Sequence, residues 1–344
     1  MMNSTLFRFR AFLQACALVC GVLLSGQALA QGALERIKVP GPSLEGNLAG
    51  ESPERDVFVY LPPGYAGAAG KRYPVVYFLH GYAVGAQIYV DGVLRLPASA
   101  DQAIAAGSRE MIVVVPDAFT RFGGSMYSSS PTIGDWEGFI ARDLVTYIDA
   151  HYRTIPSREG RGLSGHSMGG YGTLRIGMRH PEVFGALYAM SSCCLLNQAP
   201  DREAVETQIA RMAQGLESSE RSFANSLQAQ ASAWAPNPQN PPHYFDWPYQ
   251  DGEARPLVQH KWTANSLLIL VDQYVPAFKQ YRAIMLDVGD KDRLADTNTQ
   301  FDAALTRLSV AHGWEVYDGE HGNRIGQRFV DKLLPFFSKH LAEE

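Results

Sequence analysis

The chain has 344 residues, of which 46% are hydrophobic and 19% charged, and its formal net charge is −5. That length excludes a mini-protein and suits one large globular domain with a substantial core. An acidic chain without a basic stripe argues against nucleic acid as a partner. Nothing in the composition predicts a particular oligomeric state.

The first thirty residues differ in character from the rest. Arg8 and Arg10 precede an apolar run over residues 11–24, and Ala-Leu-Ala follows at 28–30, with small residues at the two positions that precede cleavage sites. This pattern predicts a signal peptide that is cleaved after Ala30, and hence a secreted or periplasmic protein. Cleavage takes the formal net charge from −5 to −7, because two arginines and no acidic residue are lost. An uncleaved membrane anchor is the alternative, although the run is short for a span of about 20 residues. No later stretch predicts stable membrane insertion.

In the remaining chain, residues 31–344, apolar runs alternate with amphipathic stretches. This alternation predicts an α/β catalytic domain in which a mostly parallel central sheet has helices on both faces. The predicted strands are residues 56–61, 75–79, 111–115, 162–166, 185–190, 283–288 and 314–317. The predicted helices carry the apolar stripe of residues 139–148 and cover residues 169–180, the stretch around 301–308, and 325–341.

Residues from about 195 to 267 do not follow this alternation. Polar helical sequence leads into residues 234–249, where prolines and five large aromatic residues suit neither a strand nor a helix interior. We interpret the segment as an insertion over the active-site edge of the sheet, and a surface linker is the alternative. We expect the aromatic residues of 241–249 to form one wall of the substrate pocket; otherwise they pack against the core.

The motif Gly165-His166-Ser167-Met168-Gly169 lies between a predicted strand and a predicted helix. A G-x-S-x-G pattern in that context indicates a sharp turn that presents the serine hydroxyl above the sheet. Glycines are needed on either side, because side chains there would collide with the neighbouring strand and helix. The sequence therefore predicts Ser167 as a nucleophile.

A serine nucleophile needs a base, and a histidine base needs an acid behind it. Of the nine histidines, His321 follows the last predicted strand, at the edge where open α/β sheets bind ligands. Asp287, Asp290 and Asp292 lie at the end of the preceding strand, with Asp287 inside it and Asp292 furthest into the loop. Spacing alone leaves Asp290 and Asp292 open as the acid.

The oxyanion donors are expected to be backbone N–H groups, those of Met168 after the nucleophile and of Tyr82 after the strand 75–79. No cofactor motif and no metal-ligand spacing occurs, so we expect neither a cofactor nor a metal. Cys193 and Cys194 are adjacent. Two buried thiols are favoured over a vicinal disulfide, because neighbouring Cα atoms are closer than disulfide geometry prefers.

From about Val57 to the C-terminus the chain resembles the esterase D branch of the α/β-hydrolases, which contains feruloyl esterases, S-formylglutathione hydrolases and mycolyltransferases. The motifs that carry the resemblance are V-Y-L-P-P-G at 59–64, F-L-H-G at 78–81, G-H-S-M-G-G at 165–170, G-D-K-D at 289–292 and G-E-H-G at 319–322. The resemblance implies an α/β-hydrolase fold with Ser167 as nucleophile, Asp292 as acid and His321 as base. It also assigns the oxyanion amides to Tyr82 and Met168.

These residues predict a secreted serine esterase that acts on a small-molecule or polymer-linked ester through an acyl-enzyme on Ser167. An acyltransferase that passes the acyl group to an alcohol or sugar hydroxyl would use the same three side chains. A non-catalytic binding protein on a hydrolase fold is a third alternative, although such a protein would normally have lost one of the three.

Overall fold

The computed structural model describes residues 31–214 and 223–343. The predicted signal peptide and its cleavage site fall on residues 1–30 and therefore lie outside the described residues.

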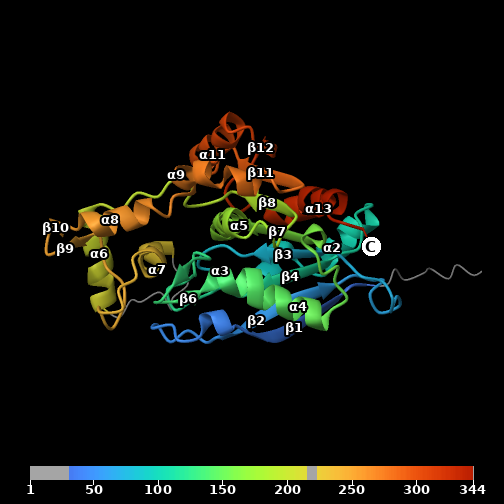
Figure 1. Ribbon diagram of the computed structural model, residues 1–344, viewed down its shortest axis with the longest axis horizontal. Coiled ribbons are helices and arrows are strands. Elements are labelled where there is room, and N and C mark those ends of the chain that lie inside the picture. The colour runs from blue at the N-terminus through green and yellow to red at the C-terminus, as the bar shows by residue number, and fades with distance from the viewer. Residues whose placement is uncertain (1–30, 215–222, 344) are drawn as a thin grey trace, which may run out of the picture. The chain divides into compact units, whose positions relative to one another are not determined.

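The central sheet has eight strands in the order β1-β2-β4-β3-β7-β8-β11-β12 (Figure 1). β2 runs antiparallel to β1 and β4, and every other pairing is parallel. The strands are β1 (Ala33–Pro40), β2 (Glu54–Leu61), β3 (Val75–Leu79), β4 (Ile112–Pro116), β7 (Arg161–His166), β8 (Ala186–Met190), β11 (Ala283–Gly289) and β12 (Gly313–Tyr317). The two-residue strands β5 (Ser129–Ser130) and β6 (Gly134–Asp135) form a separate hairpin.

Helices cover both faces of this sheet (Figure 1). One face is covered by α3 (Trp136–Gly138), η3 (Phe139–Leu144), α4 (Val145–His151), α5 (Met168–Arg179), α10 (Val275–Phe278) and α11 (Ala295–Arg307). The other is covered by α1 (Ala86–Ile88), η2 (Tyr89–Leu94), α2 (Ala98–Ala105), α12 (Ile325–Arg328), η7 (Phe329–Leu333) and α13 (Leu334–His340). The predicted mostly parallel α/β architecture is confirmed.

The buried strand β3 shows why the sequence has uninterrupted apolar runs. Tyr77 and Leu79 pack into the core on the α5 side, whereas Val76 and Phe78 pack into the core on the α12–α13 side. Successive side chains of a strand point to opposite faces, so a strand with helices on both faces must be apolar at every position.

The N-terminal strand β1 was not predicted. It pairs with β2 along its whole length, from Ala33 opposite Leu61 to Pro40 opposite Glu54. As an edge strand it is mostly exposed or half-buried, with only Val39 fully buried. The predicted helix 325–341 is present as α12, η7 and α13 in succession, and η7 is a π-helical turn.

Between β8 and β11 the chain forms further elements, of which α6, α7, α8, β9 and β10 lie to one side of the sheet in Figure 1. They are α6 (Arg202–Ala213), η5 (Phe223–Asn225), α7 (Ser226–Trp234), β9 (Tyr249–Gln250), β10 (Glu253–Ala254), α8 (Pro256–Thr263), α9 (Leu267–Leu270) and η6 (Val271–Tyr274). Trp234 links this group to the main domain, because its ring lies 5.8 Å from Tyr171 of α5 and 5.7 Å from Trp262 of α8. The segment is thus anchored on the helix that follows the nucleophile motif.

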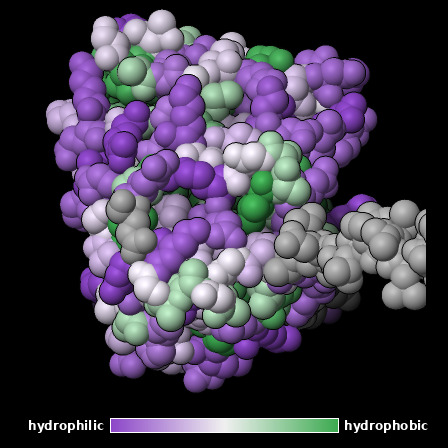
Figure 2. Space-filling model, turned by 90° about the vertical axis from the view of Figure 1, so that its right-hand side faces the viewer, coloured by the Kyte–Doolittle hydropathy of each residue, from purple (hydrophilic) through white to green (hydrophobic). Residues whose placement is uncertain are grey.

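Figure 2 shows one face of the molecule, on which the described residues are mostly hydrophilic and hydrophobic ones form small separate patches. Within residues 31–214 and 223–343, no helix combines the length and apolar character needed to span a bilayer.

Candidate active site

The sheet topology brings four loops together at one edge. β3, β7, β11 and β12 are parallel members of the same sheet, so their carboxyl ends lie on the same side. These ends lead into Tyr82, Ser167, Asp292 and His321, respectively. Side chains from widely separated parts of the sequence therefore meet at the edge where open α/β sheets bind ligands.

Ser167 occupies a strained turn between β7 and α5. Its φ is +57°, a left-handed value that is unfavourable for a residue with a side chain. The turn is held because Ser167 N–H donates to the Met190 carbonyl at 3.0 Å. A side chain at Gly165 would overlap the Gly169 backbone, and one at Gly169 would overlap the Leu79 carbonyl. The two glycines are required by close backbone approach, as the motif indicated.

His321 bridges Ser167 and Asp292. Its Nε2 lies 2.9 Å from Ser167 Oγ, and its Nδ1 lies 2.8 Å from Asp292 Oδ2. A carboxylate can only accept, so Nδ1 carries the proton and Nε2 faces the serine hydroxyl with a lone pair. The structure thus joins the three predicted side chains in one hydrogen-bonded chain.

Asp292 is held as a carboxylate. Its side chain is fully buried, and burial alone would raise its pKa. Hydrogen bonds from His321 and from the Leu294 N–H, the latter at 2.9 Å, outweigh that effect and bring the pKa below its ordinary value. Asp290 points elsewhere, because its Oδ1 accepts the Gly319 N–H at 2.9 Å. Of the two aspartates that spacing left open, Asp292 is the one in contact with His321.

Tyr82 and Met168 both adjoin Ser167. Met168 begins α5, and the first N–H groups of a helix have no partner inside it. Tyr82 follows Gly81, where an added Cβ would lie 3.5 Å from the Cβ of Ser167. Both backbone segments thus lie next to the serine.

A cavity of about 290 Å³ opens beside Ser167. It is lined by Tyr82, Met126, Ser167, Cys193, Cys194, Phe223, Ser226, Gln230, Arg293 and Leu294. The insertion contributes Phe223 of η5 with Ser226 and Gln230 of α7, and the Phe223 ring lies 6.0 Å from that of Tyr82. Sequence analysis singled out four of these lining residues and missed the other six, which are Met126, Phe223, Ser226, Gln230, Arg293 and Leu294. Two of the six were adjacent to an informative position, since Arg293 and Leu294 directly follow Asp292.

The expectation that residues 241–249 form a wall of this cavity is wrong. Among the described residues, none of that loop lines it. Phe245 is only 2% exposed and packs edge-on against Phe122 and Trp247, at ring distances of 5.6 and 5.3 Å. The dense aromatic residues therefore stabilise the insertion against the core.

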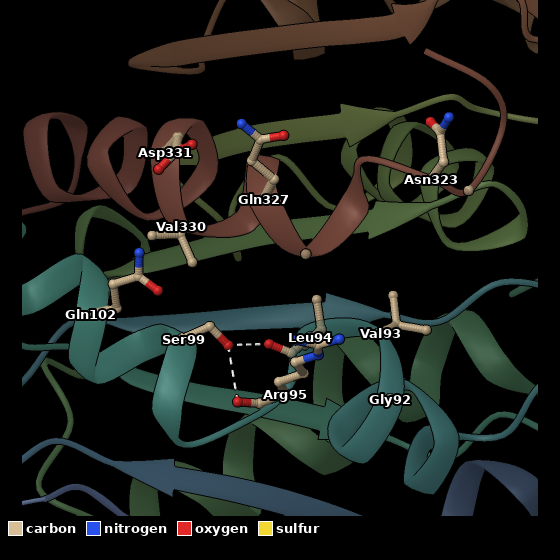
Figure 3. Close-up of a pocket in the computed structure, with 12 residues that line it drawn as sticks. Gly92, Val93, Leu94, Arg95, Ser99, Gln102, Asn323, Gln327, Val330 and Asp331 are labelled. Carbon is tan, nitrogen blue, oxygen red and sulfur yellow. Dashed lines mark hydrogen bonds between the residues drawn. The ribbon is translucent and has the colours of Figure 1, made fainter.

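A second cavity, of about 550 Å³, lies between α2 and the C-terminal helices (Figure 3). Ser99 and Gln102 of α2 face it from one side, and Gln327 and Asp331 from the other. The Ser99 hydroxyl donates to the carbonyls of Leu94 and Arg95, so it is engaged with its own backbone. Ser167 is not among the residues that line this second cavity. We therefore assign the second cavity no role in the active site.

Cys193 and Cys194 are free thiols at the wall of the Ser167 cavity. Their Sγ atoms lie 2.7 Å apart. Burial is the main cause that raises the pKa of Cys193 well above its ordinary value, and the neighbouring Cys194 thiol raises it further. Because the thiolate is the reactive form, the raised pKa lowers the reactivity of this thiol at neutral pH.

A mostly parallel eight-stranded sheet, with a serine on a strand–helix turn and a histidine and an aspartate on the loops after two later strands, defines an α/β-hydrolase. Residues 52–329 match the family model described as "Putative esterase". The chain belongs to this esterase family.

Two curated relatives, both esterases of Mycobacterium tuberculosis strains, are each 31% identical to this chain over 135 residues. The match covers 38% of this chain and 27% of the relative, so the chain spans about a quarter of the length of these proteins.

Solved structures share the fold across nearly the whole chain. A ferulic acid esterase has a TM-score of 0.64 at 23% identity, covering 90% of this chain and 99% of its own. The fluorophosphonate-binding serine hydrolase F of Staphylococcus aureus has a TM-score of 0.62 at 17% identity, with coverages of 90% and 99%. An S-formylglutathione hydrolase of Agrobacterium tumefaciens has a TM-score of 0.61 at 18% identity, with coverages of 91% and 97%.

Proposed function

We propose that the chain is a secreted serine esterase that hydrolyses a small-molecule or polymer-linked carboxylic ester through an acyl-enzyme on Ser167. The observation that carries the proposal is the hydrogen-bonded chain from Ser167 Oγ through His321 to Asp292. Export rests on the signal-peptide pattern of residues 1–30.

In the proposed mechanism, His321 Nε2 accepts the hydroxyl proton while Ser167 Oγ attacks the ester carbonyl carbon. The Tyr82 and Met168 N–H groups stabilise the oxyanion that forms. The tetrahedral intermediate collapses, the C–O bond to the alcohol breaks, and the alcohol leaves with the proton from His321. Water then attacks the acyl-enzyme, again giving its proton to His321, and the acid is released while Ser167 recovers its hydrogen. Asp292 orients the imidazole and stabilises its protonated form.

Replacement of the nucleophile tests the mechanism. Ser167→Ala is expected to lower ester turnover by on the order of 10³-fold or more, leaving only the contribution of binding and the oxyanion donors. A fluorophosphonate probe, to which one structural neighbour binds, is expected to label the native chain on the peptide that contains Ser167 and to leave the variant unlabelled. Native-level turnover by the variant would refute the proposal.

Substrate choice is addressed by a panel of feruloyl, acetyl and butyryl esters of one alcohol, followed by acetyl esters of several alcohols. The first series varies the acyl group and the second varies the alcohol leaving group. Together they show whether the enzyme discriminates between esters by the acyl group or by the alcohol. Export is tested separately by N-terminal sequencing of the protein recovered from outside the cytoplasm, which is expected to begin at Gln31.

A further inference from the structure

Two buried histidines lie next to the site but take no part in the proposed chemistry. His80 is fully buried and His166 is 4% exposed. The hydrogen bonds of both rings go to backbone groups and to Tyr89, itself 3% exposed. A buried imidazole destabilises the fold unless its two ring nitrogens have hydrogen-bond partners. Which partner donates and which accepts therefore shows which ring nitrogen carries the hydrogen.

The bonds of His166 define its proton position. Its Nε2 lies 2.7 Å from the backbone carbonyl oxygen of His321, which can only accept, so Nε2 carries the hydrogen. Burial lowers the pKa of His166 to about 3, so the ring is neutral and Nδ1 has a free lone pair. Tyr89 Oη, 2.8 Å away, therefore donates to Nδ1.

Tyr89 continues the chain to the other side of the site. Its hydroxyl oxygen packs directly against the Gly81 backbone. Contact is so close that a Cβ at Gly81 would lie 2.5 Å from Tyr89 Oη. Two hydrogen bonds thus run from Tyr89 through His166 to the His321 backbone, and Tyr89 itself packs on the Gly81 backbone.

His80 holds the opposite side of Gly81. The Ala118 N–H donates to His80 Nε2 at 2.9 Å, so the ring hydrogen is on Nδ1 and is donated to the Gly81 carbonyl at 2.8 Å. Asp117 Oδ1 lies 3.5 Å from the same Nε2, so the Ala118 N–H is the closer partner of that nitrogen. Since a peptide is planar, fixing the Gly81 carbonyl also fixes the direction of the Tyr82 N–H.

We propose that His80, Tyr89 and His166 are positioning residues that hold the Tyr82 oxyanion donor and the His321 base in one rigid frame. The proposal rests on the proposed function, since it assigns Tyr82 and His321 their catalytic roles. Oxyanion stabilisation and proton transfer both depend on groups placed before the reaction begins. Hydrogen bonds and the close packing of Tyr89 on Gly81 together connect the two backbone segments, through side chains that do not line the Ser167 cavity.

Tyr89→Phe tests the frame by removing one oxygen atom. We expect kcat to fall on the order of tenfold while KM stays within about twofold, because transition-state geometry is loosened and ground-state binding is not. The fluorophosphonate labelling rate is expected to fall with kcat. Tyr77→Phe is the matched control: Tyr77 is fully buried on β3, and its hydroxyl has no hydrogen-bond partner among the described residues. The proposal is overturned if Tyr89→Phe keeps native kcat, or if Tyr77→Phe loses as much.

A second measurement does not depend on any variant folding. ¹⁵N spectra of the native imidazoles are expected to show that His166 is neutral at pH 6 and carries its proton on Nε2. A charged ring, or a proton on Nδ1, would overturn the frame.

His166→Gln, which can still donate to the His321 carbonyl, is expected to keep more activity than His166→Leu. The frame fails independently of the proposed function if Ser167→Ala is inactive while Tyr89→Phe matches the native enzyme.

Discussion

The Asp292 carboxylate lies 2.8 Å from Nδ1 of His321, whereas Asp290, two residues earlier, binds the Gly319 backbone instead. Asp292→Asn is expected to lower kcat about 10³–10⁴-fold with the fold retained, because an amide no longer enforces the Nδ1–H tautomer of His321. Steady-state kinetics on the preferred ester, with melting temperature as the measure of folding, provide the test.

Asp290→Asn is the matched control for that experiment. The amide oxygen of asparagine can still accept the Gly319 N–H, so we expect turnover to change by no more than a few-fold. The assignment of the acid would be wrong if the two variants exchanged their effects.

Phe223 is predicted to influence which esters are preferred. It is 60% exposed and lines the cavity beside Ser167, so Phe223→Ala removes cavity wall without opening the core. We expect the order of kcat/KM values across the ester panel to change, while the melting temperature changes little.

Phe245→Ala is the counterpart, a phenylalanine of the same insertion that is buried away from the cavity. Its loss is expected to destabilise the protein by about 3–5 kcal/mol, as for other buried aromatic truncations, and to leave the order of esters unchanged. If the order of kcat/KM values changed for Phe245→Ala and stayed the same for Phe223→Ala, the assignment of Phe223 to the cavity and of Phe245 to the core would be contradicted.

The strands and the serine turn were predictable because their signals are local. Every residue of β3 is apolar since both faces of the strand are buried, and the glycines around Ser167 are required by contacts of their own backbone. Parallel strands then bring their carboxyl ends to one edge, so the order of the strands and loops was enough to expect His321 and an aspartate near Ser167.

The remainder depended on contacts between distant segments. Tyr89 is 77 residues from its partner His166, and no motif connects them. Dense aromatic sequence at 241–249 is compatible with both a binding wall and a packed core, and only the tertiary fold decides. The edge strand β1 was missed because its exposed side chains weaken the alternation that identifies strands.

The adjacent cysteines lead to a prediction about thiol reagents. Burial raises the pKa of Cys193, so iodoacetamide is expected to react slowly at pH 7. Once formed, the adduct occupies the cavity and should slow ester turnover. Ester turnover and the extent of alkylation, which mass spectrometry measures, are recorded over the same time course. The double variant Cys193→Ala/Cys194→Ala is the control and should keep its activity in the reagent. Equal inhibition of this double variant would show that the effect arises elsewhere.

The neutral His166 is expected to make the protein sensitive to acid. An unfolded histidine has a pKa of about 6.5, whereas burial lowers the pKa of native His166 to about 3. Between these values the unfolded chain binds a proton that the native protein does not, so this residue's contribution to stability falls as the pH drops from about 6.5 towards 3.

The variant His166→Gln removes this titration and keeps a donor for the His321 carbonyl. Its melting temperature is expected to be lower than that of the native protein near pH 7.5, where the native hydrogen bonds are intact, and to depend less steeply on pH between about 6.5 and 4. Thermal unfolding across that range measures both slopes. His260→Gln, at an exposed position of α8, controls for the loss of a surface histidine and should keep the native slope. Parallel slopes for the native protein and His166→Gln would mean that His166 is not the group that carries this acid sensitivity.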